Sequence, residues 1–518
     1  MNIYWLNPPP RTNSLPVDLG WMNFRTACKG YNWIQPILDW EEYEHISEIV
    51  DHIIQNDTEV LCASTYMWNH QLVHEILTAA KKANPNIIII RGGPHQGYDE
   101  TFFERFPYID YLCYSTGHGE LFLIEALNQL NKYKTILFPN NVPYLISKNF
   151  KSKILSGRYH YPDESSFEYN LEYLSLLVST ANFKGKKTII PFETSRGCPY
   201  SCVYCEWGGG IGTKVSKRSM DVIKKDIEVI SYLGLHDLEL IDANFGIFDQ
   251  DIEILNCMLE YRKITGYPES IMTYGLAKVK PEKKQRILEA MFAEGMTTTY
   301  SMSMQTIDDT VMKNLKRTDI TVQEQINLAQ KFIDKYNAVV KVEIIMGIPG
   351  TTLDIFYDEC DVFQQIGSWF NSRNLFILLP DSEAYSKEYR EKFKIKSAVV
   401  GACENDEELY YDHAKGVISK YKSPTEIVVS TYSFTIEDWK EMFFVNHAQR
   451  VLGPKIPKGE KASIVLRKWF NKIKNEPWYI EIDQWMNKFV NNEMMTVNTD
   501  KYNDVFLEKY VEDNFNGF

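Results

Sequence analysis

PFETSRGCPYSCVYCEWGGG, residues 191–210, places three cysteines within eight positions: Cys198, Cys202 and Cys205. Their spacing is C-x3-C-x2-C, with no histidine inside the stretch and no second cysteine pair nearby. Structural zinc sites use four ligands, so a set of three thiols indicates a different metal centre. Three thiolates suit a [4Fe-4S] cluster that leaves one iron open to a small molecule. The alternatives are zinc with a distant fourth ligand and three incidental buried cysteines.

The chain as a whole has the composition of a globular protein. Its 518 residues exceed what one core holds, so two or three domains are expected. A net charge of -13 disfavours nucleic acid as a partner, because binding a phosphate backbone requires positive charge. The N-terminus has no signal-peptide pattern and no run of about 18 apolar residues occurs, which predicts a cytoplasmic protein with no membrane partner. Nine cysteines, an odd number, fit reduced thiols better than a disulfide framework.

Residues 1–140 alternate apolar strands with amphipathic helices. The strands are expected in NIYWL (2–6), EVLCAST (59–65), NIIIIRGGPH (86–95) and IDYLCYSTGHGE (109–120). Continuous apolar strands separated by helices predict an α/β domain, with a Rossmann-like (flavodoxin-like) parallel sheet covered on both faces. Such sheets bind ligands at the carboxyl ends of their strands. Residues 141–187 turn polar and aromatic, which predicts a linker.

The strand and helix alternation resumes over residues 188–400. Six strands are expected, in TIIPFETSRGC (188–198), DLELIDANF (237–245), IMTYGLA (271–277), TTTYSMSMQ (297–305), VVKVEIIMGIPG (339–350) and NLFILLP (374–380). This pattern predicts a partial or full (β/α) barrel with its site at the carboxyl ends of the strands. Residues 401–518 predict a mainly α-helical C-terminal domain, with amphipathic helices over 433–453 and 462–490.

The cysteine spacing, with Tyr204 directly before the last cysteine, resembles the radical S-adenosylmethionine (SAM) superfamily. IDANF (241–245), SMSMQTIDDTVMKNLKR (301–317) and EIIMGIPGTT (343–352) are similar to strand-end segments of that family's barrel, in the same order. The resemblance covers roughly residues 188–385, and it implies that the three cysteines hold a [4Fe-4S] cluster. The SAM contacts that it implies are Tyr204, Asn244, Gln305, Arg317 and Gly347. Most of these residues also have a structural alternative. Asn244 and Gln305 could bind backbone at strand ends, Arg317 could form a surface ion pair, and Gly347 could make a simple turn.

Four short motifs in residues 1–140 resemble the cobalamin-binding domain found ahead of the barrel in cobalamin-dependent (B12-binding) radical SAM enzymes. They are NPPP (7–10), STYMWN (64–69), GGPH (92–95) and TGHGE (116–120), each at the end of an expected strand. Glycines there let backbone approach a large flat ligand, and hydroxyl groups can bind its amides. The cobalamin contacts implied by the resemblance are Pro9, Ser64, Thr65, Trp68, Asn69, Gly92, Gly93, Gly117, Gly119 and Glu120.

The sequence departs from many cobalamin proteins in one respect. None of its ten histidines stands in a D-x-H-x-x-G motif, whose histidine ligates cobalt from below. His95 and His118 are the remaining candidates, but we expect cobalt without a protein ligand and with Trp68 or a neighbour packed near its lower face. A position in the core is the structural alternative for Trp68.

A second cluster is a rival interpretation of the N-terminal region. Cys28, Cys62 and Cys113 could bind one, as the N-terminal cysteines of methylthiotransferases do. However, Cys62 and Cys113 lie inside expected buried strands, where free cysteine behaves as a small hydrophobe. The acidic charge and the helical C-terminus also disfavour a tRNA substrate.

The resemblance implies a C-methyltransferase that acts on a peptide or small natural product. In such enzymes a reduced cluster cleaves SAM to a 5'-deoxyadenosyl radical, and methylcobalamin methylates the substrate carbon. A flavodoxin- or ferredoxin-type electron donor is implied as a partner, and no catalytic side chain is assigned. The alternatives are a cobalamin-dependent radical cyclase, ring-contraction or rearrangement enzyme, and a non-catalytic cobalamin- or SAM-binding partner protein.

Substrate recognition is expected after residue 400. VSTYSFTIEDWKEMFF (429–444) resembles the region that follows the barrel in this subfamily, and Tyr432, Trp439 and Phe443 are candidates to face a cavity. Aromatic residues at helical spacing are more often part of a core. Residues 455–474 hold seven basic residues and one acidic residue, which indicates either a solvated face or a site for an acidic peptide or carrier protein.

Overall fold

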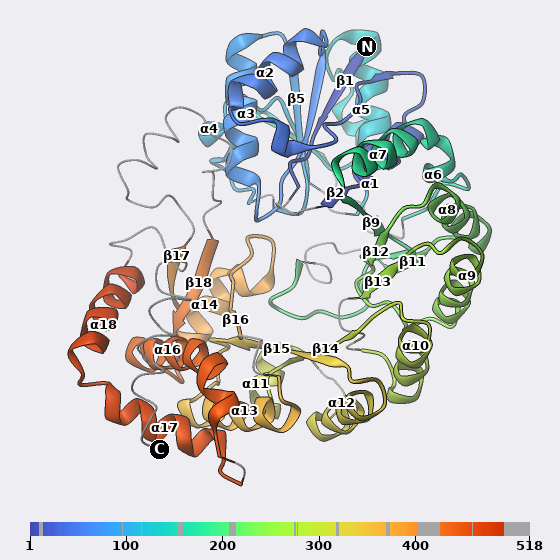
Figure 1. Cartoon of the computed structure of the whole chain (residues 1–518). Helices are drawn as coiled ribbons and strands as arrows, with labels where there is room; N and C mark the ends of the chain where they lie inside the picture. Colours follow the sequence, from blue (N-terminus) through green and yellow to red (C-terminus); the bar gives the residue numbers. More distant parts are fainter. Residues whose placement is uncertain are drawn as a thin grey trace. The chain divides into compact units, whose positions relative to one another are not determined.

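The computed structural model describes most of the chain (Figure 1). The described residues are 1–9, 14–95, 97–114, 117–152, 159–206, 214–273, 276, 278–317, 321–368, 373–400, 425–457 and 459–491. They fall into two compact units. The first contains Met1–Tyr200 and Glu206–Thr273, and the second contains Ser201–Cys205 and the described residues after position 273.

Seven strands form the first sheet, in the order β3-β1-β4-β5-β6-β7-β8. Their bounds are β1 Asn2–Leu6, β3 Asn32–Trp33, β4 Val60–Ser64, β5 Ile88–Gly92, β6 Tyr111–Cys113, β7 Leu145–Ser147 and β8 Phe150–Lys151. The first five strands in this order are parallel, which confirms the parallel sheet expected from the apolar runs of residues 1–140. Strand β4 is buried along its whole length because the sheet is covered on both faces.

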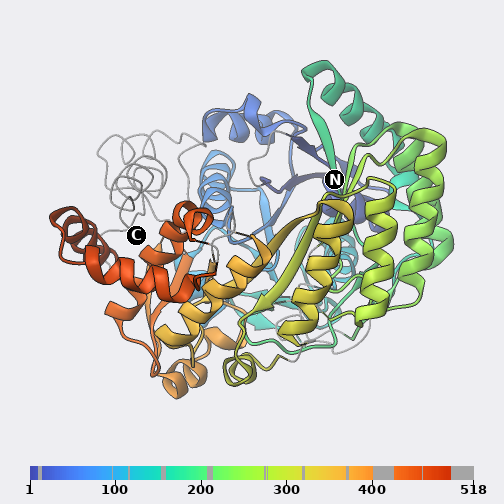
Figure 2. The ribbon, with the colours of Figure 1, turned by 60° about the horizontal axis from the view of Figure 1, so that its bottom comes forward.

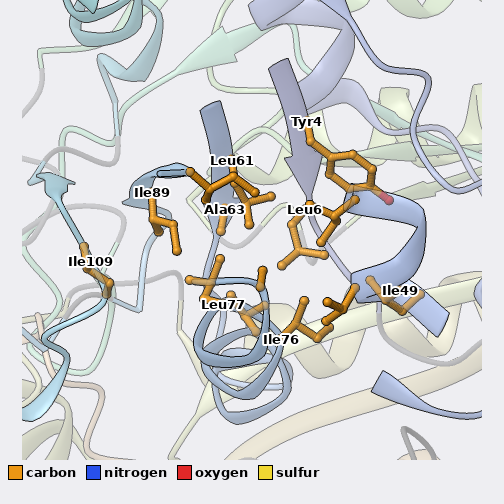
Figure 3. Close-up of a cluster of buried hydrophobic side chains, with 14 of the residues drawn as sticks. Tyr4, Leu6, Ile49, Leu61, Ala63, Ile76, Leu77, Ile89 and Ile109 are labelled. Atoms are coloured by element: carbon orange, nitrogen blue, oxygen red, sulfur yellow. The ribbon is translucent and has the colours of Figure 1, made fainter. Parts of the chain in front are cut away.

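Helices α2 (Ile46–Gln55), α3 (His70–Ala83) and α4 (Phe102–Arg105) pack on one face of this sheet. Figure 1 shows α2 and α3 on one side of the sheet and α5 (Gly119–Tyr133) on the other, where α5 contacts α1 (Leu19–Ala27). Figure 3 shows the apolar core between the sheet and α2 and α3. Its members include Leu6, Leu61, Ala63 and Ile89 from the strands and Ile49, Ile76 and Leu77 from the helices. Burial of these side chains is the main force that holds α2 and α3 to the sheet.

Residues 141–187, for which we predicted a linker, form regular elements. Strands β7 and β8 add to the first sheet in antiparallel order, and two helices follow, α6 (Ser166–Tyr169) and α7 (Leu171–Lys184). The two strands have only three and two residues, too few for an alternating pattern to show in the sequence. Helix α7 ends at Gly185, whose left-handed conformation (φ +62°) stops the helix.

The first unit also contains a second parallel sheet, in the order β13-β12-β9-β2. Its strands are β2 Ser14–Pro16, β9 Lys187–Phe192, β12 Asp237–Leu240 and β13 Ser270–Thr273. Residues 14–16 thus belong to the sheet of the cysteine region, although they precede the first helix of the chain. Helices α8 (Met220–Leu233) and α9 (Gln250–Thr265) form the crossovers, and a short antiparallel pair joins β10 (Ser195–Arg196) to β11 (Ser216–Lys217).

The second unit contains a parallel sheet of β14 (Thr299–Gln305), β15 (Val339–Met346) and β16 (Asn374–Leu375). Figure 2 shows α12 (Val322–Tyr336) and α13 (Leu353–Ile366) lying against β14 and β15. The shorter elements before and after them are α10 (Pro281–Ala293), α11 (Asp309–Asn314) and α14 (Lys387–Phe393). All six strands expected for residues 188–400 are present, in the order β9, β12, β13, β14, β15 and β16.

The C-terminal region is mainly helical, as predicted. Helices α16 (Ile436–Leu452), α17 (Ala462–Ile473) and α18 (Pro477–Val490) follow the antiparallel pair of β17 (Lys396–Val400) and β18 (Thr425–Ser430). We expected one helix over 462–490, but Pro477 starts a new helix because proline lacks the N–H group that a continuous helix requires. Within the described ranges no helix combines the length and hydropathy needed to span a bilayer.

Replacing Gly93 with alanine tests the close backbone contact at the end of β5. Gly93 has φ +98°, and a Cβ there would overlap the backbone nitrogen and carbonyl oxygen of Thr65. Gly93→Ala should destabilise the first unit by about 2–4 kcal/mol, because strain and overlap add. Gly266→Ala is the matched control. Gly266 has φ +87° but open space around it, so this variant should lose only about 1 kcal/mol of unfolding free energy. Equal losses of urea midpoint for the two variants would contradict this account.

Candidate functional site

The three cysteines lie on the segment 193–205, here called the cysteine loop, which follows β9 and includes the short strand β10. None of their thiols forms a disulfide, and all three side chains are half-buried. The loop passes from the first unit to the second after Tyr200, so Cys198 belongs to the first unit and Cys202 and Cys205 to the second. In the second unit the backbone N–H of Cys205 donates to the carbonyl of Cys202 at 3.1 Å. No group of three or more His, Cys, Asp or Glu side chains among the described residues is arranged to hold a metal ion, so the ligand set rests on the spacing and chemistry of the cysteines.

One buried carboxylate fixes the start of this loop. Asp242, at the end of β12, accepts hydrogen bonds from the backbone N–H and hydroxyl groups of both Thr194 and Ser195, directly after β9. Burial raises the pKa of Asp242 to about 7, although the hydrogen bonds from Ser195 and Thr194 act in the opposite direction. Sequence reasoning missed this residue, because the 48 positions between Asp242 and Thr194 hide the contact.

Asn244 lies two positions further along the same segment. Its amide nitrogen donates to the sulfur of Cys198 at 3.1 Å. Asn244 is a predicted SAM contact, and in the structure its amide also binds a predicted cluster ligand. The same strand end therefore holds the loop at two places, at Thr194 and Ser195 and again at Cys198.

The end of β14 positions the predicted SAM contacts of the second unit. Gln305 is buried and has φ +66°, unusual for a residue with a side chain, and the pairing of β14 with β15 shifts between Ser303 and Gln305. The guanidinium of Arg317 donates to the Tyr204 hydroxyl and, at 2.6 Å, to the Ser303 carbonyl. Burial raises the pKa of Tyr204, so its hydroxyl stays neutral. Arg317 is therefore not a surface ion pair.

Gly347 follows β15 and has φ +97°. A Cβ there would come within 3.3 Å of the Val428 carbonyl oxygen. The following turn is tied to α11 and to the C-terminal region, because Asn314 donates to the Pro349 carbonyl at 2.7 Å and Ser433 accepts from the Gly350 N–H at 2.9 Å. The turn predicted from GIPG (347–350) is thus held in place by side chains of Asn314 and Ser433.

The predicted cobalamin contacts gather at the carboxyl edge of the first sheet. Thr65 donates to the carbonyls of Gly92 and His95 at 3.0 Å, and Asn69 donates to the Pro8 carbonyl at 2.9 Å. Ser64 and Gly92 are paired across the ends of β4 and β5. The two polar side chains therefore hold the loops after β1, β4 and β5 together, which shapes this edge.

Trp68 remains almost half exposed, with 47% of its surface accessible, and its ring stacks on Tyr66 at 4.5 Å. It is thus not a core residue. His95 stacks on His70 at 4.3 Å, and burial lowers the His95 pKa to about 3. His118 is buried and stacks on Tyr144 at 5.2 Å. Both candidate histidines pack against aromatic rings inside the domain.

The turn at 117–120 contacts the cysteine loop through a residue that our sequence reasoning gave no role. Arg196 donates to the Gly117 carbonyl at 3.2 Å and to both oxygens of Glu120 at 3.0 and 3.1 Å. It also binds both oxygens of Glu193 at 2.9 and 2.8 Å. This bridge borders a cavity of about 260 Å3 that α1 and α5 also line. Glu120, expected to contact cobalamin, is thus engaged by Arg196, and Gly119 starts helix α5 beside it.

The structure does not favour a second cluster at Cys28, Cys62 and Cys113. All three are buried. Burial raises the pKa of Cys28 and Cys62, so they remain neutral thiols, whereas metal binding requires thiolates. They pack as small hydrophobic side chains, as expected for Cys62 in β4 and Cys113 in β6.

The C-terminal candidates divide between core and surface. Trp439 is fully buried and stacks on Phe443 at 5.0 Å, so it belongs to the helical core, whereas Tyr432 is 53% exposed. The basic stretch 455–474 is partly neutralised by α13, because Arg467 pairs with Asp354 at 2.6 Å and Lys461 lies 3.9 Å from Asp361. This stretch is in part a seam between α13 and α17.

Known protein families match both the region of the first sheet and the region of the three cysteines. The family described as the B12 binding domain matches residues 14–122, and the family described as the Radical SAM superfamily matches residues 192–361. The chain therefore carries a B12-binding domain ahead of a radical SAM domain. The cofactors of this class are cobalamin, a [4Fe-4S] cluster and SAM.

Two relatives match across most of the chain. It is 25% identical over 403 residues to the cobalamin-dependent radical SAM methyltransferase TokK of Streptomyces tokunonensis, covering 77% of this chain and 57% of TokK. It is 26% identical over 432 residues to the 2-(S-pantetheinyl)-carbapenam-3-carboxylate methyltransferase of Streptantibioticus cattleyicolor, covering 82% of this chain and 60% of that enzyme. The chain thus spans less than two thirds of either relative.

A solved structure shares the fold. The radical SAM methyltransferase TsrM from Kitasatospora setae, with tryptophan substrate and a SAM analog bound, aligns with a TM-score of 0.60 at 13% identity. The alignment covers 99% of this chain and 98% of TsrM. At this identity the likeness concerns the fold alone.

The described residues fit the cofactors of the class. None of the three cysteines is in a disulfide, and Asn244 donates to the sulfur of Cys198. Sulfur ligands held by hydrogen bonds are what an iron–sulfur cluster requires. At the first sheet, a Cβ at Gly93 would overlap the Thr65 backbone, so glycine lets the segments after β4 and β5 lie close together at the carboxyl edge.

The raised pKa of Asp242 predicts a pH-dependent stability. Because the folded-state pKa (about 7) lies above the ordinary value of 3.8, its contribution is fully present below 3.8 and is lost as pH rises through about 7. Asp242→Asn resembles the protonated form and keeps an acceptor for Thr194 and Ser195. Relative to the variant, the wild type should therefore lose up to about 4 kcal/mol between pH 4 and pH 8. Parallel curves of unfolding temperature against pH would show that Asp242 does not titrate in this range.

Removing the Asn244 amide should change the electron affinity of a cluster bound by Cys198. A donor to sulfur stabilises the more negative, reduced state, so Asn244→Leu should lower the midpoint potential by an amount on the order of tens of millivolts. Asn244→Asp should lower it further, because a carboxylate repels the reduced cluster. Redox titration followed by electron paramagnetic resonance (EPR) spectroscopy measures both shifts, and an unchanged potential in the leucine variant would count against the Asn244–Cys198 bond.

Proposed function

We propose that this chain is a cobalamin-dependent radical SAM C-methyltransferase. The observation that carries the proposal is the joint presence of a cysteine loop anchored at Cys198 by Asn244 and of a B12-binding domain in one chain. Both relatives described above are named as methyltransferases, which supports the choice of methyl transfer as the reaction.

The chain's own side chains have distinct tasks in this proposal. Cys198, Cys202 and Cys205 hold the cluster, and Asn244 orients the first of them. The SAM site at the ends of β14 and β15 is shaped by Gln305, Arg317, Tyr204 and Gly347. When bound, the reduced cluster supplies the electron that cleaves SAM to methionine and a 5'-deoxyadenosyl radical, and methylcobalamin supplies the methyl group.

The first sheet provides the cobalamin site through its carboxyl edge. The exposed ring of Trp68 and the backbone at Gly92 and Gly93 offer flat apolar surface and close approach. His95 and His118 are packed against other rings, which supports cobalt without a protein ligand. Glu120 and Thr65 hold the loops around the site.

The proposed substrate is a small natural product or a peptide with an unactivated carbon. The relative from Streptantibioticus cattleyicolor is named for a small pantetheinyl carbapenam, which favours the first of these. A flavodoxin- or ferredoxin-type protein would supply the electron, and the cytoplasm is the proposed location, where such donors and reduced thiols coexist.

A triple variant with Cys198, Cys202 and Cys205 changed to Ala tests the cluster ligands. After anaerobic reconstitution with iron, sulfide and hydroxocobalamin, the wild type should hold about four irons and one cobalamin per chain. The variant should lose the iron and SAM cleavage but keep cobalamin, because its B12-binding domain is untouched. Full iron retention would remove these cysteines as ligands, and iron without cobalamin in the wild type would remove methylcobalamin from the proposal.

The reaction itself is tested by supplying methyl-labelled SAM with candidate substrates. Label in a new carbon–carbon bond, together with 5'-deoxyadenosine, supports methyl transfer. Cleavage of SAM that converts a substrate without label would instead indicate a radical cyclase, ring-contraction or rearrangement enzyme. Binding of both cofactors with no cleavage under reducing conditions would indicate a non-catalytic partner protein.

A further inference from the structure

The bridge formed by Glu120, Arg196 and Glu193 lies between two parts of the first unit that have separate tasks. Arg196 stands two positions before Cys198, on the cysteine loop. Glu120 stands in the first turn of α5, directly after the Gly117 turn at the edge of the first sheet. The guanidinium binds both oxygens of each carboxylate, with four contacts between 2.8 and 3.1 Å.

The bridge is buried, so solvent screens it little. The exposed fractions of the Arg196, Glu120 and Glu193 side chains are 12%, 9% and 11%. The ring of Tyr159 covers the guanidinium, with its centroid 4.1 Å away. A planar guanidinium held by two carboxylates and an aromatic ring has little freedom to rotate, so the backbone at Arg196 is fixed relative to Gly117 and Glu120.

A contribution to folding stability does not by itself explain why Glu120, Arg196 and Glu193 form a buried bridge. Buried ion pairs can often be replaced by apolar residues at no cost, because desolvation offsets their attraction. Here two negative charges surround one positive charge, which is a costly choice for a purely structural contact. What the arrangement does supply is a fixed geometry between the turn and the loop.

We infer that Arg196 is a positioning residue that couples the carboxyl edge of the first sheet to the cysteine loop. This inference rests on the proposed function, because it assigns cobalamin to the edge that contains Gly117 and Glu120. Because the bridge fixes Arg196 relative to Gly117 and Glu120, a ligand bound at that edge acts on the same rigid group that positions the residues before Cys198. The state of the cluster thereby depends on whether cobalamin is bound.

The informative variant is Glu120→Gln. It keeps the size of the side chain and leaves a neutral pair of Arg196 and Glu193, whereas removal of Arg196 would leave two buried carboxylates facing each other and endanger folding. Arg196→Lys is the second variant, because lysine keeps the charge but cannot bind two carboxylates in a fork. Glu359→Gln is the matched control: Glu359 pairs with the buried Arg373 at 2.9 Å in the second unit.

Two measurements are made on iron-loaded full-length protein: the dissociation constant of hydroxocobalamin by absorbance, and the EPR spectrum of the reduced cluster with SAM, with and without cobalamin. In the wild type, cobalamin should change the spectrum. Glu120→Gln and Arg196→Lys should keep their iron, bind cobalamin roughly 10- to 100-fold more weakly and lose the cobalamin-dependent spectral change. Glu359→Gln should lower the unfolding temperature without either effect.

The coupling is overturned if Glu120→Gln keeps the wild-type affinity and the spectral change, or if Glu359→Gln loses both to the same degree. A wild type that holds iron but binds no cobalamin would overturn the proposed function and this coupling together. In that case the EPR spectrum of Glu120→Gln still tests whether Arg196 positions the cysteine loop. An altered cluster spectrum would keep Arg196 as a positioning residue of the loop, and an unaltered one would remove that role too.

Discussion

The cysteine loop takes its direction from the buried carboxylate of Asp242. This group accepts hydrogen bonds from Thr194 and Ser195, the residues at which the chain leaves β9. Burial makes a carboxyl group costly to ionise, and here the group is the hydrogen-bond acceptor for the backbone N–H groups of Thr194 and Ser195. Two residues later, Asn244 holds the sulfur of Cys198. The segment after β12 therefore fixes both the origin of the loop and its first cysteine.

Parallel sheet geometry explains why these contacts meet. Strands β9 and β12 are neighbours in register, so the residues that follow them emerge side by side at the same edge. The same rule acts in the first sheet, where the ends of β4 and β5 bring Thr65 against Gly92 and Gly93. In both sheets, paired strands bring together segments that are separated in the sequence, and short polar side chains join these segments.

How much could be predicted from the sequence depended on how local the signal was. Most strands of the three parallel sheets follow from apolar runs, but the short strands β2 and β3 were not predicted. The three cysteines follow from their spacing. The short strands β7 and β8 leave no periodic signal, and Pro477 divides a helix whose apolar pattern continues across it. The role of Arg196 depends on Glu120, 76 positions away, and that pairing exists only once the fold brings them together.

In the second unit the end of β14 holds the segment Ser201–Cys205 through a different contact. Gln305 adopts a left-handed backbone conformation that costs a non-glycine residue about 1–3 kcal/mol, at a point where the strand pairing slips. Such a cost persists only where the surroundings fix the backbone. Arg317 does so by binding the Ser303 carbonyl, and its other nitrogen binds Tyr204, the neighbour of Cys205. The strained strand end and the last cysteine are thus held by one guanidinium, so the strain at Gln305 and the placement of Cys205 depend on the same contact.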